Sequence, residues 1–272
     1  MKKTLYLAFT LIGASALTAP AITLYSNGFE TDIAGWTTPT RVASGTGGIT
    51  SADGAFHATT AATPFTQWGG YNYGAGAAPT AFQDYTTSVD IFLNLGGGWA
   101  NDTRFDFSSA INNAAGTHLR DFIFNAGFYG SADLTGPGAG TNRFIISASN
   151  NSQPGSAYAK DPGKAPIAIS TTGWYTFEHH FYDNGGILAV DMSIIDSSNT
   201  LVNTWTISTT DSISATGGNR YGWFDYNQFP TLAFDNAELH TNPASVPDGG
   251  TTLVLLGGAL TGLGALRRKF RK

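Results

Sequence analysis

The sequence predicts an all-β body, an antiparallel two-sheet sandwich, with an apolar segment at each end of the chain. Three observations support this prediction. Apolar and polar residues alternate in many short runs, as in strands with one buried face. Clusters of Gly, Asn, Asp and Pro separate these runs and favour turns. Glycine supplies 34 of the 272 residues, well above the usual ~7 %.

The first 21 residues have the three parts of a secretory signal peptide. A basic start, Met1-Lys2-Lys3, precedes a mostly apolar stretch from Leu5 to Leu17. Ala19-Pro20-Ala21 then has the small-x-small spacing of a cleavage site. We expect cleavage after Ala21, and cleavage after Ala16 also fits the pattern. The body, residues 22–245, would then be exported.

Within the body, the short apolar or alternating runs predict a series of strands. They lie at residues 22–25, 49–51, 55–59, 66–69, 86–93, 102–108, 121–128, 143–147, 174–182, 188–195, 201–207, 220–226 and 232–240. Polar, Gly- and Pro-rich loops are expected at 131–140 and 150–166. No internal repeat or long linker divides the body, so a single sandwich domain is expected over residues 22–245.

The hairpin at 174–195 has the clearest pattern. Tyr175, Phe177 and Phe181 alternate with polar neighbours, which predicts a strand buried on one face. Residues 183–186, Asp-Asn-Gly-Gly, predict the turn because Asn and Gly tolerate positive φ angles. The apolar alternation continues in residues 188–195, so these residues form the partner strand.

Two groups of residues resemble known sandwich families. Residues 173–207, with Trp174 opening a strand before two hairpins, resemble concanavalin A-like jelly rolls. Residues 27–30, Asn-Gly-Phe-Glu, and residues 232–239 are similar to the first and last strands of jelly-roll carbohydrate-binding modules. This resemblance implies a structural Ca²⁺ near those strands, with Glu30 and Asp235 at the corresponding places. The alternative is that Glu30 caps a turn and Asp235 hydrogen-bonds a loop.

Composition excludes several kinds of function. The chain has no cysteine, so a disulfide scaffold, a thiolate zinc site and a cysteine nucleophile are all excluded. Residues 22–250 hold 19 acidic and seven basic residues, a net charge of −12. Nucleic acids and anionic lipids are bound through cationic surfaces, so neither is an expected partner.

The last 27 residues form a membrane-sorting tail with three parts. Residues 246–250 read Val246-Pro247-Asp248-Gly249-Gly250. The apolar run 251–266 would make a helix of about 24 Å, short for a transmembrane span. The basic residues at the end favour a cytoplasmic location for that end and can lengthen the span by snorkelling; they are Arg267, Arg268, Lys269, Arg271 and Lys272.

This tail resembles the PEP-CTERM class of bacterial sorting signals, in particular the variant with the motif Val-Pro-Asp-Ser-Gly. Gly249 stands where that variant has serine. The resemblance implies that an exosortase, a membrane-embedded transpeptidase, recognises residues 246–250 and processes the chain beside them. The alternative is a transmembrane anchor at 251–266 that is never cleaved. Either way the precursor is anchored in the inner membrane with its body outside.

Aromatic side chains near Gly-rich stretches suggest a platform for sugar rings. The candidate ligand-binding residues are Trp68, Tyr71, Tyr73, Trp99 and Trp223. The alternative is that these aromatics belong to the sandwich core, where large rings are common.

Catalytic patterns are weak. Asp102, Arg104 and Asp106 would share one face of a strand, as would Glu178 and His180. No nucleophile elbow or zinc-protease motif is present. The leading interpretation is therefore a non-catalytic, exported surface or matrix protein that binds polysaccharide. A polysaccharide hydrolase or lyase of jelly-roll fold and a purely structural matrix protein are the two alternatives.

Overall fold

The computed structural model describes residues 21–37, 39–61, 67–69, 82–150 and 159–241. The predicted signal peptide, the sorting motif and the apolar run 251–266 lie outside these residues, except for Ala21. Within the described part of the chain, no helix is long and apolar enough to cross a membrane.

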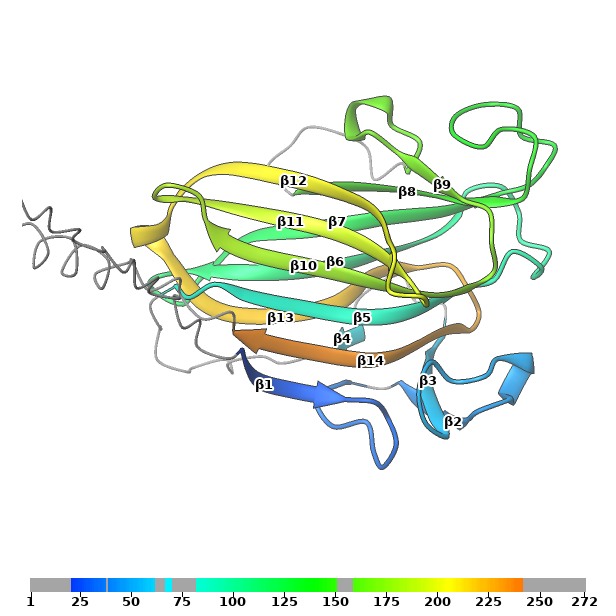
Figure 1. Ribbon diagram of the computed structural model, residues 1–272, viewed down its shortest axis with the longest axis horizontal. Coiled ribbons are helices and arrows are strands. Elements are labelled where there is room, and N and C mark those ends of the chain that lie inside the picture. Colours follow the sequence, from blue (N-terminus) through cyan, green and yellow to red (C-terminus); the bar gives the residue numbers. More distant parts are fainter. Residues whose placement is uncertain (1–20, 38, 62–66, 70–81, 151–158, 242–272) are drawn as a thin grey trace, which may run out of the picture. The chain divides into compact units, whose positions relative to one another are not determined.

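The described residues form two antiparallel sheets, so the predicted all-β class is confirmed (Figure 1). The first sheet has the order β12-β11-β10-β5-β14-β3-β2, and β1 also pairs with β14. Its strands are β1 (Ile22–Asn27), β2 (Thr40–Ala43), β3 (Phe56–Thr60), β5 (Tyr85–Leu93), β10 (Gly173–Asp183), β11 (Ile187–Asp196), β12 (Leu201–Ser212) and β14 (Leu232–Thr241).

The second sheet has the order β4-β13-β6-β7-β8-β9. Its strands are β4 (Gln67–Gly69), β6 (Thr103–Asn113), β7 (His118–Tyr129), β8 (Arg143–Asn150), β9 (Ile167–Ile169) and β13 (Thr216–Asn227). Three single-turn 3₁₀ helices complete the described elements: η1 (Thr46–Gly48), η2 (Pro162–Lys164) and η3 (Ile213–Ala215).

Aromatic rings from both sheets form the core between them. The Phe177 ring of the first sheet meets Phe105 and Phe124 of the second, with centroids 5.9 and 5.2 Å apart. His179 lies among these rings with no exposed surface, and burial lowers its pKa to about 3. The predicted alternation is confirmed here, because Glu178 and His180 lie on the opposite face of β10 from His179.

Strand β14 explains why the two chain ends of the body lie together. One side of β14 pairs with β5. The other side is shared: Leu232–Phe234 pairs with β3, and Ala237–Thr241 pairs with β1. Between these two partners Asn236 adopts a φ of 46°, and the register against β5 shifts. Asp235 therefore lies at a gap between β1 and β3.

Most predicted strands are present, often longer than expected, but the strand predicted at 49–51 is wrong. The polypeptide turns there instead: Gly45 N–H donates to Ile49 O, and Ser51 N–H donates to the Ser44 hydroxyl. Strands β2 and β9 were not expected. Both are edge strands of four and three residues, too short to show a period of two.

Candidate functional site

A hollow of about 370 Å³ opens at the end of the sandwich where the β5–β6 loop meets the β7–β8 loop. It is open to solvent, and its volume is at the lower end of the range of about 300–1,000 Å³ typical of ligand sites. The described lining is uncharged and consists of Leu95, Gly96, Gly98, Trp99, Phe128, Gly130, Ser131, Ala132 and Asn142.

Trp99 forms an aromatic wall of this hollow and is held in place on several sides. Its indole N–H donates to the carbonyl of Asn94 at 2.8 Å. The ring meets Phe229 edge to face, with centroids 5.2 Å apart. Gly97 lies directly against the indole, where a Cβ atom would come within 2.1 Å of Cε2. The sequence predicted Trp99 as a ligand contact, and the structure places it in a concave, partly exposed position.

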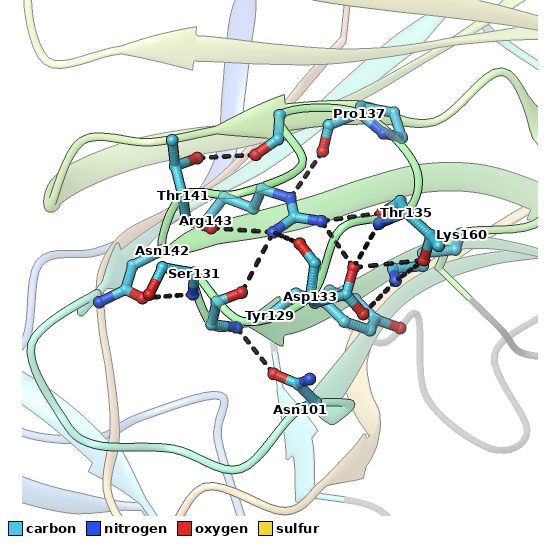
Figure 2. A network of polar contacts seen from close by, with 12 residues as sticks. Asn101, Tyr129, Ser131, Asp133, Thr135, Pro137, Thr141, Asn142, Arg143 and Lys160 are labelled. Atoms are coloured by element: carbon cyan, nitrogen blue, oxygen red, sulfur yellow. Dashed lines mark hydrogen bonds and ion pairs between the residues drawn. The ribbon is translucent and has the colours of Figure 1, made fainter.

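Asn142 lines the hollow, and Asn101 contacts Gly130, another lining residue; Figure 2 shows both side chains. Asn142 Oδ1 accepts the N–H of Ser131 at 2.9 Å, and Asn101 Oδ1 accepts the N–H of Gly130 at 2.8 Å. Within the described part of the chain, neither carboxamide nitrogen has a hydrogen-bond partner. Each side chain thus fixes the loop with its oxygen and keeps two N–H groups as donors.

A buried arginine shapes the loop that carries four of the nine lining residues. Arg143, the first residue of β8, has no exposed surface, and its guanidinium points into the loop of residues 130–142 (Figure 2). Its N–H groups donate to the carbonyls of Pro137 at 2.6 Å and of Thr135 and Thr141 at 2.8 Å. Because one rigid side chain satisfies three loop carbonyls, the loop is held in one conformation.

Asp133 joins this arginine to a second cation. Its Oδ1 lies 2.9 Å from Arg143 and its Oδ2 lies 2.6 Å from Lys160 Nζ. Lys160, then the N–H of Thr135 and Arg143, hold the pKa of Asp133 well below its usual range. The Lys160 ammonium also lies 4.1 Å from the ring centroid of Tyr129, a cation–π contact. We call Arg143, Asp133 and Lys160 the loop clamp.

Sequence reasoning predicted the loop at 131–140 but missed the loop clamp. A signal was available, because Arg143 opens a run of apolar residues that must be buried, and a buried cation needs a partner. The partner could not be identified from that signal, since several acidic residues lie nearby in the sequence.

Two of the other predicted platform residues, Trp68 and Trp223, lie on strands of the second sheet. Trp223 on β13 is the cross-strand partner of Trp68 on β4, and it also pairs with Ser108 on β6. The register therefore pairs these two positions on neighbouring strands of the second sheet. Tyr71 and Tyr73 lie outside the described residues.

Glu30 and Asp235, the predicted calcium ligands, both hold the turn between η1 and β3. Asp235, fully buried, accepts the N–H groups of Ala52 and Asp53 at 3.1 and 3.4 Å. Glu30 accepts the N–H groups of Ala55 and Phe56 at 3.0 Å. Carboxylate oxygens that face N–H groups are poorly placed to ligate a cation. Among the described residues, no three His, Asp or Glu side chains are grouped as a metal site.

The predicted catalytic pairs are also engaged in the fold. Asp102 precedes β6 and accepts the hydroxyl of Tyr129 at 2.8 Å. Arg104 lies over the Tyr226 ring, 4.8 Å from its centroid. Asp106 is buried beside Asn125. His180 stacks on Tyr182, with centroids 5.1 Å apart.

Comparison with known proteins identifies the tail. Residues 245–270 match the family described as the VPDSG-CTERM motif, which confirms the resemblance seen in the sequence. No curated protein matches the chain.

Two solved structures are among those similar to this chain. One is the CBM2 module of the evolved Dit of Lactobacillus casei BL23 phage J-1, with a TM-score of 0.42, 11 % identity, and coverage of 84 % of this chain and 99 % of that module. Another is basic winged bean lectin with Tn-antigen, with a TM-score of 0.39, 11 % identity, and coverage of 82 % and 99 %.

Proposed function

We propose that this chain is an exported, non-catalytic surface or matrix protein that binds polysaccharide in the hollow beside Trp99. The sorting motif at 245–270 implies export. We further propose that an exosortase-type membrane transpeptidase acts on residues 246–250 of an inner-membrane-anchored precursor. The body is then delivered to the cell envelope or the extracellular matrix.

The observation that carries the binding proposal is the geometry of the hollow. An indole wall offers the flat apolar surface on which a sugar ring can stack. The free carboxamide N–H groups of Asn142, which lines the hollow, offer donors to sugar hydroxyls. The loop clamp fixes the loop that carries Asn142 before a ligand arrives, and Asn94 and Phe229 fix Trp99, which reduces the entropy cost of binding. The lining is neutral, which suits binding better than the acid–base chemistry of a hydrolase or lyase.

Binding is tested by glycan array with the full chain in detergent, followed by calorimetry with the best neutral oligosaccharide. We expect Trp99→Ala to weaken binding about tenfold or more, since aromatic contacts and buried ring area together exceed ~1.4 kcal/mol. Trp174→Ala is the matched control. Its indole N–H also donates to a backbone carbonyl, that of Thr50 at 2.7 Å, but it does not line the hollow.

Asn142→Asp is a sharper variant because it keeps the oxygen that accepts the Ser131 N–H and removes the carboxamide donors. We expect weaker binding, by about three- to tenfold, with an unchanged unfolding temperature. Full affinity in both Trp99→Ala and Asn142→Asp, with the fold intact, would sink the assignment of the hollow as the binding site.

Sorting is tested separately by the mass of the mature protein in cells with and without the candidate exosortase. We expect loss of the segment after about Pro247 only when the enzyme is present. An intact tail in both strains would instead show a plain transmembrane anchor.

A further inference from the structure

A lysine, an asparagine and an aspartate lie in line on the outer face of the second sheet. Asp106 on β6 and Asn125 on β7 are direct cross-strand partners. Asn125 Nδ2 donates to Asp106 Oδ1 at 2.9 Å. Lys164, the last residue of η2, donates from Nζ to Asn125 Oδ1 at 3.1 Å. The Lys164 amine thus contacts the carboxamide oxygen of Asn125, and the Asp106 carboxyl group contacts the carboxamide nitrogen.

The surroundings favour the reactive forms of both ionisable groups. Asp106 is 5 % exposed and Asn125 is 2 % exposed. Burial raises the pKa of Asp106 to about 6, although the hydrogen bond from Asn125 and the charge of Arg104 lower it. Burial also lowers the pKa of Lys164. Burial thus favours the protonated form of the acid and the uncharged form of the amine.

The carbonyl oxygen of Asn125 is polarised by a second donor. The Ser149 hydroxyl, on β8, donates to Asn125 Oδ1 at 3.0 Å. Donors aimed at this oxygen would stabilise the negative charge that develops on it when a nucleophile attacks Cγ. Three elements of the sheet and η2 hold the four side chains, so the groups are oriented before any reaction.

We propose that Lys164 and Asn125 join in an intramolecular isopeptide bond, with Asp106 as the catalytic proton-transfer residue. The neutral Nζ attacks Cγ, and the Nζ–Cγ bond forms. Asp106 donates its proton to Nδ2, the Cγ–Nδ2 bond breaks, and ammonia leaves. Asp106 then takes a proton from Nζ and is restored. The sum is one amine and one carboxamide giving one secondary amide and one ammonia, without an oxidant or any co-reactant.

The neighbouring Lys160 shows what the site requires. Its Nζ is 2.6 Å from Asp133 Oδ2, closer than Lys164 is to Asn125. Asp133, however, is ionised and also pairs with Arg143. A carboxylate anion is a poor acyl donor to an amine, so Lys160 remains an ion pair. Proximity of a lysine is therefore insufficient, and the buried Asp106 distinguishes the two places.

Such a bond would suit this chain. An exported domain commonly gains stability from disulfides, and this chain has no cysteine. The bond would tie η2 to β7 in the middle of the second sheet and close a loop between positions 39 residues apart. It is independent of the proposed glycan binding, because none of the four residues lines the hollow.

The test is mass spectrometry of the purified full chain after prolonged incubation at neutral pH. We expect an intact mass lower than that of the sequence by one ammonia, after allowance for signal-peptide removal. Tryptic digestion should give peptides 121–143 and 161–220 joined to each other, with no cleavage after Lys164. The unmodified mass in folded protein would overturn the proposal.

Substitutions test the role proposed for each residue. Lys164→Arg keeps the charge without a comparable nucleophile, and Asp106→Asn keeps an acceptor for Asn125 Nδ2 without a transferable proton. We expect both to retain the full mass. Lys160→Arg, the same change four positions away, should still lose ammonia. Ammonia loss that persists in Lys164→Arg would indicate succinimide formation, as at Asn184-Gly185, and would refute the cross-link. Cross-linking in Asp106→Asn at the original rate would refute the role of Asp106.

Discussion

Replacing Arg143 with methionine tests whether the loop clamp holds the loop of residues 130–142. Methionine has a similar length and suits a buried position, but it offers no donor. The change leaves the carbonyls of Thr135, Pro137 and Thr141 without their 2.6–2.8 Å donors. It also removes one of the two cations beside Asp133.

The expected cost follows from the burial of the guanidinium. Removing one partner of a buried ion pair costs about 3–5 kcal/mol. Asp133 keeps Lys160, and the loop carbonyls can reach water if the loop opens, so we expect the lower end, about 3 kcal/mol. For a domain of this size that corresponds to a decrease of about 6–12 °C in the unfolding temperature.

The assay combines urea unfolding with hydrogen exchange of peptides from residues 130–142. We expect loss of protection in this loop to exceed that in the core strands, and we expect weaker glycan binding because Ser131 and Asn142 lose their fixed positions. Arg143→Lys should lose almost as much stability, because one ammonium cannot reach three carbonyls at once. A change below about 1 kcal/mol with unaltered loop protection would refute this account of the clamp.

Two further predictions concern the turn held by Glu30 and Asp235. Burial, with a contribution from the charge of Asp90, raises the pKa of Asp235 to about 7. The folded state therefore binds this proton more tightly than the unfolded chain, whose Asp pKa is about 3.9, so the free energy of unfolding should fall as pH rises from about 4 to about 7. Urea unfolding at several pH values should show a flatter profile for Asp235→Asn; equal slopes would contradict the assignment. Because both carboxylates face N–H groups, we also expect equal unfolding temperatures in calcium and in EDTA. A calcium-dependent increase that Glu30→Gln abolishes would show that the turn can rearrange into a metal site.

The sequence predicted the strands whose alternation is long enough to be read, such as β10 and β11. It failed at residues 49–51, which turn through the Gly45–Ile49 and Ser44–Ser51 hydrogen bonds. The next residue, Ala52, donates its N–H to Asp235, a residue far away in the chain. That hydrogen bond joins positions 183 residues apart. Local periodicity carries no information about such a partner, and strands β2 and β9 are too short to show a period of two.

The candidate sites were predictable to different degrees. Trp99 was identified from its residue type and its Gly-rich neighbourhood, which are local features. The line from Asp106 through Asn125 to Lys164 was not, because its members are ordinary polar residues until the sheet register brings them together. Asp106 was identified only as part of a strand pattern with Asp102 and Arg104. Its burial, which gives it a reactive proton, comes from tertiary structure.

The contacts made by the seven Lys and Arg residues of the body indicate which class of glycan the domain would favour. Of the seven, only Arg220 has no described side chain. The other six all have partners inside the fold. Arg120 pairs with Asp211 at 2.5 Å, and Arg41 donates to the carbonyl of Phe29.

The remaining four cations are already engaged in the contacts described above: Arg104 with Tyr226, Arg143 and Lys160 in the loop clamp, and Lys164 with Asn125. These cations stabilise an acidic domain and do not form a basic surface. An anionic polysaccharide would meet uncompensated negative charge on approach. A neutral glycan would meet the uncharged lining of the hollow, so a neutral glycan is the ligand that this charge distribution favours.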